Sequence, residues 1–178
     1  MSDIFKTIYG KHEFWKMVKD YEDYSVSSFG RVRNDKTDKI MKPSKNTQGY
    51  YQVGLYKNGK EKKHRVNRLV AIAFLPNHDN KPMVDHIDEN KMNNNITSLR
   101  WATRSQNGYN KGKQKNNMTG FNGVSLHKGS QKYNAQININ GKNTHLGLFQ
   151  TTEDASQAYE AKAKEIHKEF YYKINNLI

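Results

Sequence analysis

Alternating apolar and polar residues predict a group of short strands in the first part of the chain. The strands are expected at residues 24–27, 31–33, 50–56 and 62–66. Asn58-Gly59 separates the last two, and this dipeptide favours a two-residue hairpin turn because both residues accept a positive φ. A helix is expected at 67–74, and Pro76 ends it because proline has no backbone N–H to donate. Residues 1–11 are expected to form a loosely held leader.

A second sheet is predicted near the end of the chain, where residues 132–140 alternate strictly between apolar and amide side chains. The apolar positions are Tyr133, Ala135, Ile137 and Ile139. Shorter strands are expected at 123–127 and 144–149, with Asn140-Gly141 as a hairpin turn. Thr151 or Thr152 suits the start of a helix. The inner face of that helix is expected to carry Ala155, Ala158, Tyr159, Lys162 and Ile166.

Residues 108–119 separate the two patterned regions, and they are rich in Lys, Asn and Gly without any hydrophobic period. This composition is typical of a linker. The chain is therefore divided into a domain at 12–107, a basic linker at 108–119 and a domain at 120–172. Mixed strands and helices place both domains in the α+β class. The linker is either a plain spacer or a segment that orders along a partner on binding.

Composition narrows the choice of partners. The 178 residues carry a net charge of +13, with 34% hydrophobic residues and no cysteine. Disulfides and thiolate metal sites are therefore excluded. No run of about twenty apolar residues predicts a membrane span, and no apolar signal segment begins the chain. A strongly basic chain of this kind favours nucleic acid over an anionic membrane surface, because no basic helix shows a clean apolar stripe.

The densest group of chemically useful residues lies at 84–107. It begins with Asp85-His86, continues through an Asn-rich loop at 90–95, and returns through the short strand 99–102 to a segment that suits the start of a helix. The expected order is strand, loop, strand and helix. Asp85 and Asn107 would supply oxygen ligands for Mg²⁺ or Mn²⁺. His86, which titrates near neutral pH, would activate a water as general base in phosphodiester hydrolysis.

This stretch resembles the HNH nuclease motif of phage and intron homing endonucleases. The resemblance rests on Asp85-His86, on Leu99-Arg100-Trp101, and on Asn107, which follows Asp85 by 22 residues. It implies a ββα-metal module with one divalent ion, catalytic roles for Asp85, His86 and Asn107, and a bracing residue 13 positions after Asp85. That position holds Ser98, where the family usually has Asn. Either Ser98 braces His86 through a shorter side chain, or Asn94 or Asn95 takes over.

Residues 14–74 resemble the NUMOD-type module that precedes such motifs. The matching segments include Trp15, 24–27, Gly30-Arg31-Val32, Gly49-Tyr50 and 68–71, with Asn67 where the family often has His. From Arg31 to Arg68, Lys and Arg far outnumber the acids, as expected of a surface that contacts DNA phosphates. The expected DNA contacts are Arg31, Arg33, Lys62, Lys63, Arg65, Arg68, Arg100 and Arg104 in the first domain and Lys111, Lys113 and Lys115 in the linker.

The domain at 120–172 resembles the plant ethylene-response-factor (APETALA-type) DNA-binding domain, which lays a three-stranded sheet in the major groove. The reading face of the plant domain carries Arg and Trp, and this chain carries amides and histidines there. The expected contacts are Ser125, His127, Asn134, Gln136, Asn138 and His145. Asn and Gln pair with adenine edges, so a more A·T-tolerant site is expected.

These resemblances imply a homing-type endonuclease that acts on double-stranded DNA as a monomer or weak dimer. A monomer with one site would nick, whereas a dimer could cut both strands. Its expected location is the cytoplasm, in a bacterial host cell if the chain is phage-encoded. The alternative is a non-catalytic DNA-binding regulator on a nuclease-derived scaffold, which Ser98 favours. An RNA-binding module is disfavoured, because the reading faces lack aromatic platforms for stacking bases.

Overall fold

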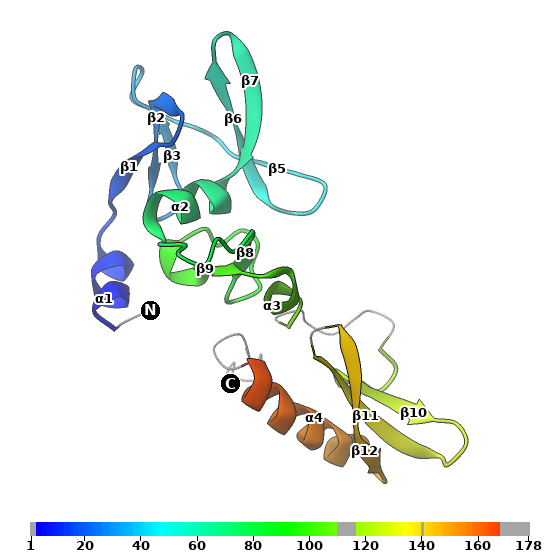
Figure 1. The fold of residues 1–178 in the computed structure, drawn as a ribbon. Coiled ribbons are helices and arrows are strands. Elements are labelled where there is room, and N and C mark those ends of the chain that lie inside the picture. The colour runs from blue at the N-terminus through cyan, green and yellow to red at the C-terminus, as the bar shows by residue number, and fades with distance from the viewer. Residues whose placement is uncertain (1–2, 110–116, 140, 168–178) are drawn as a thin grey trace. The chain divides into compact units, whose positions relative to one another are not determined.

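The structure, a computed structural model, describes residues 3–109, 117–139 and 141–167. It confirms the α+β class, with several small antiparallel sheets and few helices (Figure 1). The chain forms two compact units, 1–103 and 104–178, which we call the first and second unit. The division into domains at 12–107 and 120–172 with a linker between them stays a prediction. No helix among the described residues is long and apolar enough to cross a membrane.

Two small antiparallel sheets form most of the first unit. The first sheet has the order β1 (Trp15–Val18), β2 (Tyr21–Ser27), β3 (Val32–Asn34) and β4 (Lys39–Ile40). The second has the order β5 (Ser44–Lys45), β6 (Tyr51–Lys57) and β7 (Lys60–Arg65). The predicted hairpin between β6 and β7 is confirmed, because Lys57 pairs with Lys60 while Asn58 and Gly59 have φ of 52° and 74°.

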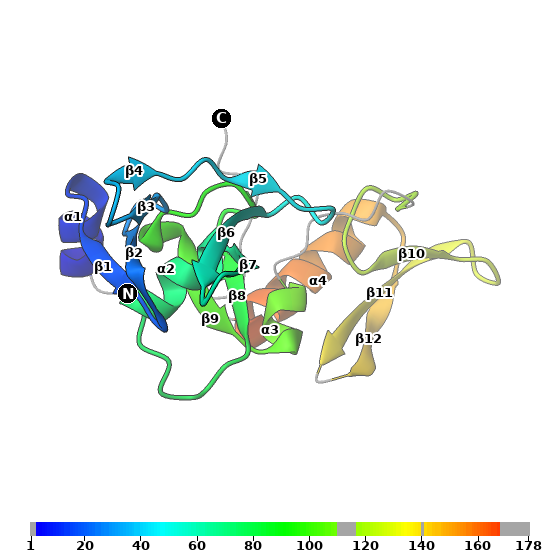
Figure 2. The same ribbon diagram turned by 90° about the horizontal axis from the view of Figure 1, so that it is seen from above.

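The leader predicted at 1–11 is wrong for the described part of that segment, which forms helix α1 (Asp3–Lys11). Tyr9 anchors this helix. Its ring packs edge-on against Phe14 at 5.1 Å and against Phe74 at 6.1 Å between ring centres. In Figure 2 α1 lies at the edge of the first unit, where the chain leads into β1. The apolar residues Ile4, Phe5, Ile8 and Tyr9 recur at helical spacing, so the sequence carried a sign of this helix that the prediction of a leader did not use.

The alternation predicted at 24–27 holds for the backbone but not for burial, because β2 buries its serines as well as its apolar residues. Ser25 donates a hydrogen bond from Oγ to Asp35 Oδ2 at 2.6 Å. The hydroxyls of Ser27 and Ser28 accept backbone N–H groups of Arg31 and Phe14, each at 3.0 Å. Both faces of β2 are therefore covered from Tyr24 to Ser27, and the small hydroxyls there replace the hydrogen bonds that water would otherwise supply.

Helix α2 (Val66–Phe74) is the centre of the first unit. It contacts β1, β2, β6 and β7 as well as the hairpin of β8 (Met83–His86) and β9 (Leu99–Ala102). Figure 1 shows it between the two hairpins β6–β7 and β8–β9. Val70 and Ala71 are completely buried on it, together with Leu99 of β9. One apolar core therefore joins the strands of the N-terminal region to the hairpin that carries Asp85 and His86.

The second unit contains α3 (Arg104–Tyr109) and the predicted three-stranded sheet with its helix. The sheet has the order β10 (Val124–His127), β11 (Lys132–Ile139) and β12 (Lys142–Phe149), and the helix is α4 (Thr152–His167). Thr151 caps α4 by accepting the Asp154 N–H at 3.1 Å. Of the predicted inner face of α4, Ala155 is fully buried and Ala158 packs against the core, but the prediction missed Ala163, which is also buried. Asn140, in the predicted turn, lies outside the described residues.

Each unit has its own apolar core, which leads to a prediction about truncation. Val26, Val70 and Leu99 belong to one core, and Val124 and Ala135 belong to the other. Deleting residues 120–178 is therefore expected to leave the first unit folded, with a cooperative thermal transition that circular dichroism can follow. A truncated protein without such a transition would mean that the first unit depends on the second for its stability.

Candidate active site

Asp85 lies on β8 in a buried ion pair. In the β8–β9 hairpin Asp85 is paired with Arg100, so their side chains share one face of the ribbon. Arg100 donates from Nε to Asp85 Oδ2 at 2.8 Å, and its Nη2 lies 2.7 Å from the same oxygen as an ion-pair contact. The side chains are 7% and 12% exposed for Asp85 and Arg100. This contact fixes the orientation of the carboxylate, because a charge-assisted hydrogen bond and a close ion-pair contact meet at one oxygen.

His86 is buried on the opposite face of β8, as strand alternation predicts. Its Nε2 lies 3.3 Å from Asn94 Oδ1, and its ring centre lies 5.8 Å from that of Tyr50. Burial lowers the pKa of His86 from the ordinary 6.5, and the positive charge of Lys91 acts in the same direction. Asn94 and the carboxylates of Asp88 and Asp85 oppose this shift. A neutral imidazole at neutral pH is the form that accepts a proton.

The loop after His86 is held by a chain of amide side chains. Asn93 donates from Nδ2 to Asp88 Oδ2 at 2.6 Å and to Ser98 Oγ at 2.8 Å. Asn95 accepts the backbone N–H of Thr97 at 2.9 Å and so caps η1 (Ile96–Ser98). Among the three candidates for bracing His86, Asn94 is therefore the residue in hydrogen-bond contact with the ring, while Ser98 and Asn95 serve the loop itself.

Asn107, the second expected metal ligand, lies on α3 in the second unit, whereas Asp85 lies in the first. Its metal role, like that of Asp85, stays a prediction. Arg104 begins α3 and is exposed. Both residues are chemically suited to the predicted roles, since an amide carbonyl is a hard oxygen donor and a guanidinium pairs with phosphate.

Several of the expected DNA-contacting arginines already have partners within the first unit. Arg31 is ion-paired with Glu13, and Arg33 pairs with Asp35 at 2.9 Å. Arg68 donates from Nη1 to the Pro82 carbonyl at 2.8 Å and lies over the Trp101 ring. These partners orient the side chains without excluding a contact with DNA, which stays a prediction for all of them.

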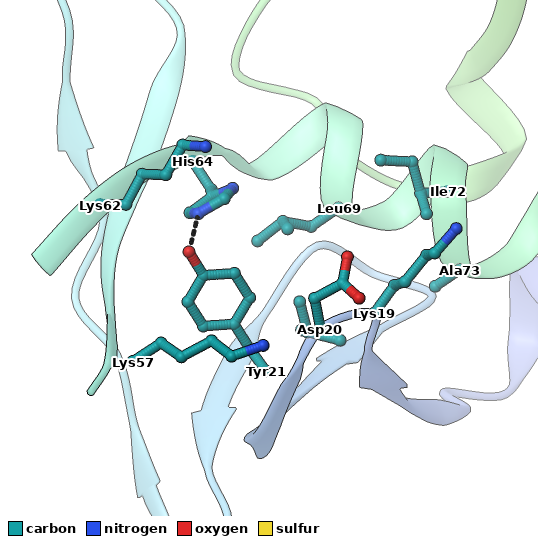
Figure 3. A pocket seen from close by; sticks show the side chains of 10 residues that line it. Lys19, Asp20, Tyr21, Lys57, Lys62, His64, Leu69, Ile72 and Ala73 are labelled. Atoms are coloured by element: carbon teal, nitrogen blue, oxygen red, sulfur yellow. Dashed lines mark hydrogen bonds between the residues drawn. The ribbon is translucent and has the colours of Figure 1, made fainter. Parts of the chain in front are cut away.

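The basic residues of β7 are distributed over its two faces, because successive side chains of a strand alternate. Lys62 lies on the face of His64, at a pocket of about 280 Å³ between the β1–β2 turn, β7 and α2 (Figure 3). In that pocket the Tyr21 hydroxyl lies 3.0 Å from His64 Nε2, and burial together with Lys62 lowers the pKa of His64. Lys63 and Arg65 lie on the other face. Neither Asp85 nor His86 lines this pocket.

The second unit brings the expected sheet contacts onto one face. Strand register pairs Ser125 with Asn134 and Gln136 with His145, and α4 packs on the other face through Val124 and Ala135. The predicted face also includes His127 and Asn138, whose side chains bond to Ser130 and Asn143. The contact of this face with DNA stays a prediction. Lys111, Lys113 and Lys115 lie outside the described residues.

Two residues near His86 were not predicted from the sequence: Tyr50 and Lys91. A third, Asn94, was only one of several alternatives. Tyr50 lies 36 positions before His86 in the chain, so only the path of the backbone brings the two rings together. Glu89 was missed as well: burial and the neighbouring charge of Asp85 raise its pKa. The Asn-rich composition of 90–95 was the one available signal for Asn94.

Two family models match the first part of the chain. Residues 13–56 match the NUMOD4 motif, and residues 61–109 match an HNH endonuclease family. The second match contains Asp85, His86 and Asn107. The residue patterns indicated a basic sheet region followed by the hairpin of β8 and β9. The two matches cover these two regions separately.

Similar proteins come from phages and a giant virus. The DNA endonuclease I-HmuI of Bacillus phage SP01 is 45% identical over 94 residues, which are 52% of this chain and 54% of that protein. The H-N-H endonuclease F-TflII of Escherichia phage T5 is 33% identical over 50% of this chain and 47% of its own length. The match thus spans about half of each relative's length. A solved structure described as "DNA binding and cleavage by the HNH homing endonuclease I-HmuI" aligns at a TM-score of 0.52 with 32% identity, covering 81% of this chain and 82% of that one.

Proposed function

Since the chain belongs to the HNH endonuclease family, we propose that it is a homing-type DNA endonuclease that hydrolyses a phosphodiester bond with His86 as general base. The observation that carries this proposal is the buried pair Asp85-His86 on β8, with the imidazole held against Asn94. Burial lowers the pKa of His86, which favours the neutral, proton-accepting ring at physiological pH.

The hydrogen bonds around Asn94 set the tautomer of His86. Asn94 donates from Nδ2 to the Met92 carbonyl at 3.3 Å, so its Oδ1 is the atom that faces His86 Nε2. A carbonyl oxygen accepts, and therefore Nε2 carries the hydrogen of the neutral ring. Nδ1 is then the nitrogen that takes the proton from the attacking water. Asn94 acts as a positioning residue in this arrangement.

Asp85 and Asn107 would hold a single divalent ion, Mg²⁺ or Mn²⁺. The chemistry of the donors fits, because Mg²⁺ prefers one or two carboxylates with other hard oxygens and keeps places for substrate phosphate. A bound ion of this kind would stabilise the charge that develops on the leaving oxygen. Arg100 contacts Asp85 Oδ2 through both Nε and Nη2, at 2.8 and 2.7 Å. We propose that Arg100 orients Asp85 rather than reading DNA.

Placement on DNA would come from the basic first unit and the polar sheet of the second. The net charge of +13 supports a phosphate-dominated, salt-sensitive affinity. The face with Asn134, Gln136 and Asn138 would select the site, since amides recognise adenine edges in the major groove. Because this face is a polar three-stranded sheet, we also propose that the second unit binds DNA in the manner of the plant ethylene-response-factor domain. The oligomeric state, monomer or weak dimer, then decides between nicking and double-strand cleavage.

The decisive experiment is incubation of the full chain with supercoiled DNA and Mg²⁺ or Mn²⁺. Conversion to the open-circular form is expected if one site acts alone, and linear DNA is expected if a dimer cuts both strands. Chelation of the ion should stop either product. Unchanged supercoiled DNA with both ions, in a preparation that still binds DNA, would support the alternative of a non-catalytic DNA-binding regulator.

A pair of substitutions tests which residue braces His86. Asn94→Ala removes the ring contact and is expected to slow cleavage roughly fivefold, the rate equivalent of one hydrogen bond of about 1 kcal/mol. Ser98→Asn is expected to leave the rate equal, because the Ser98 hydroxyl bonds to Asn93 rather than to His86. Cleavage rates with supercoiled DNA measure both. A rate that rises in Ser98→Asn while Asn94→Ala has no effect would return the bracing role to position 98.

A further inference from the structure

A cluster of aromatic, cationic and amide side chains lies beside His86 and is not explained by general base catalysis. It consists of Gln48, Tyr50, Arg65 and Lys91, and we call it the Tyr50 cluster. The guanidinium carbon of Arg65 lies 4.6 Å from the centre of the Tyr50 ring, and Lys91 Nζ lies 5.0 Å from it. The same ring lies 5.8 Å from His86. Two cations are therefore held one aromatic ring away from the general base.

The cluster is built by a tight turn before β6. Asn46 Oδ1 accepts the backbone N–H groups of Gln48 and Tyr50, each at 3.0 Å. Gln48 accepts a hydrogen bond from each of the two cations. Its backbone carbonyl accepts from Lys91 Nζ at 3.1 Å, and its side-chain Oε1 accepts from Arg65. These contacts with neutral oxygens and a ring fix the position of the cations while leaving their charge unneutralised.

The cations of this cluster have no acidic partner in the described part of the chain, in contrast to three arginines elsewhere in the first unit. Arg31, Arg33 and Arg100 are each paired with a carboxylate. Within the ranges that the structure describes, neither Arg65 nor Lys91 forms such an ion pair. Lys91 is exposed and Arg65 is half-buried, so both are open to an external anion. An immobilised guanidinium beside an ammonium is a suitable receptor for a phosphate group.

We infer that the Tyr50 cluster binds a DNA backbone phosphate next to the phosphodiester bond that His86 serves. Phosphates follow one another every 3.4 Å of helix axis along a strand, so a strand whose scissile phosphate meets His86 places a neighbouring phosphate within reach of Lys91 and Arg65. Tyr50 is a positioning residue that holds both cations beside the imidazole. The inference rests on the proposed function.

The cluster also links the two matched regions of the chain. Gln48 and Tyr50 belong to the NUMOD4 match, and Arg65, Lys91 and His86 belong to the HNH match. The basic sheet region thus contributes directly to the surroundings of the general base.

The test measures how binding of the full chain to a fluorescently labelled DNA duplex depends on salt, with a chelator present so that nothing is cleaved. Each phosphate contact contributes about 0.9 to the slope of log K against log salt concentration. Lys91→Gln and Arg65→Gln are each expected to reduce the slope by about this amount and to weaken binding roughly tenfold at low salt. Lys91→Arg should restore the slope, because it keeps the charge.

Lys36→Gln is the matched control, since Lys36 is a similarly exposed lysine that is paired with Asp23 at 2.7 Å and lies outside the cluster. Its slope should equal that of the wild type. Nicking of supercoiled DNA at saturating enzyme should be slower in Lys91→Gln but not in Lys36→Gln, which locates the phosphate beside the scissile bond. Unchanged slopes in both Lys91→Gln and Arg65→Gln would overturn the inference. A wild type that binds DNA without nicking it would instead contradict the proposed nuclease, and the slopes would still decide the phosphate contact.

Discussion

Asp85→Ala is expected to abolish cleavage while DNA binding stays within about threefold of the wild type, because many Lys and Arg contacts carry the affinity. Loss of the carboxylate removes the ligand proposed for the divalent ion, whose contribution of several kcal/mol corresponds to a rate loss of roughly 10³-fold or more. Nicking of supercoiled DNA and binding of a labelled duplex, measured on one preparation, separate the two effects. A variant that cleaves at the wild-type rate would refute the role of Asp85.

Asp85→Ala also breaks the ion pair with Arg100, so its effect on stability has to be separated from its effect on cleavage. Arg100 is 12% exposed, so Asp85→Ala leaves a buried charge without its partner at a cost of about 3–5 kcal/mol in the free energy of unfolding. The double variant Asp85→Ala/Arg100→Met removes both charges and should recover much of the thermal stability without any cleavage. Asp79→Ala, at an exposed acid paired with Lys81, should change neither property. Recovery of activity in the double variant would mean that Asp85 acts through folding alone.

His86→Ala is expected to slow cleavage by roughly 10²–10⁴-fold, the usual contribution of a general base. The ring must be neutral to accept a proton, so the wild-type rate should fall as the pH drops through the pKa of His86. Burial lowers that pKa below 6.5, and the acidic limb should therefore lie below 6.5. The residual activity of His86→Ala should lack this limb. A variant with an unchanged pH profile would remove His86 from the mechanism.

Folding has to be followed over the same pH range, because the shifted pKa also affects stability. A histidine whose pKa is lower in the folded state makes the unfolded state bind more protons, so its contribution to stability is present above pH 6.5 and is lost as the pH falls through the folded pKa. Circular dichroism at each pH distinguishes protonation of the base from unfolding. His78→Ala, at an exposed histidine outside the candidate site, should keep both the rate and its acidic limb.

Local patterns were sufficient for the longer strands and for the turn at Asn58-Gly59, but they did not predict the short strands β1, β4 and β5. The alternation at 132–140, the Asn58-Gly59 turn and the cap at Thr151 each depend on residues within a few positions of one another. Backbone conformation at such sites is set by neighbouring side chains, so it can be predicted from sequence. Helix α1 was missed although Ile4, Phe5, Ile8 and Tyr9 recur at helical spacing, and only the folded chain brings Tyr9 against Phe74.

The sequence by itself determined the chemistry of the candidate site: an acid and a histidine side by side on one strand, an amide at the expected spacing and a basic surface. The tertiary structure decided which residues meet. It brought Asn94 rather than Asn95 or Ser98 to His86, paired Arg100 with Asp85, and placed Tyr50 against the imidazole. Contacts between residues far apart in the chain depend on the register of the β8–β9 hairpin and on the path of the turn before β6, and no local pattern encodes either.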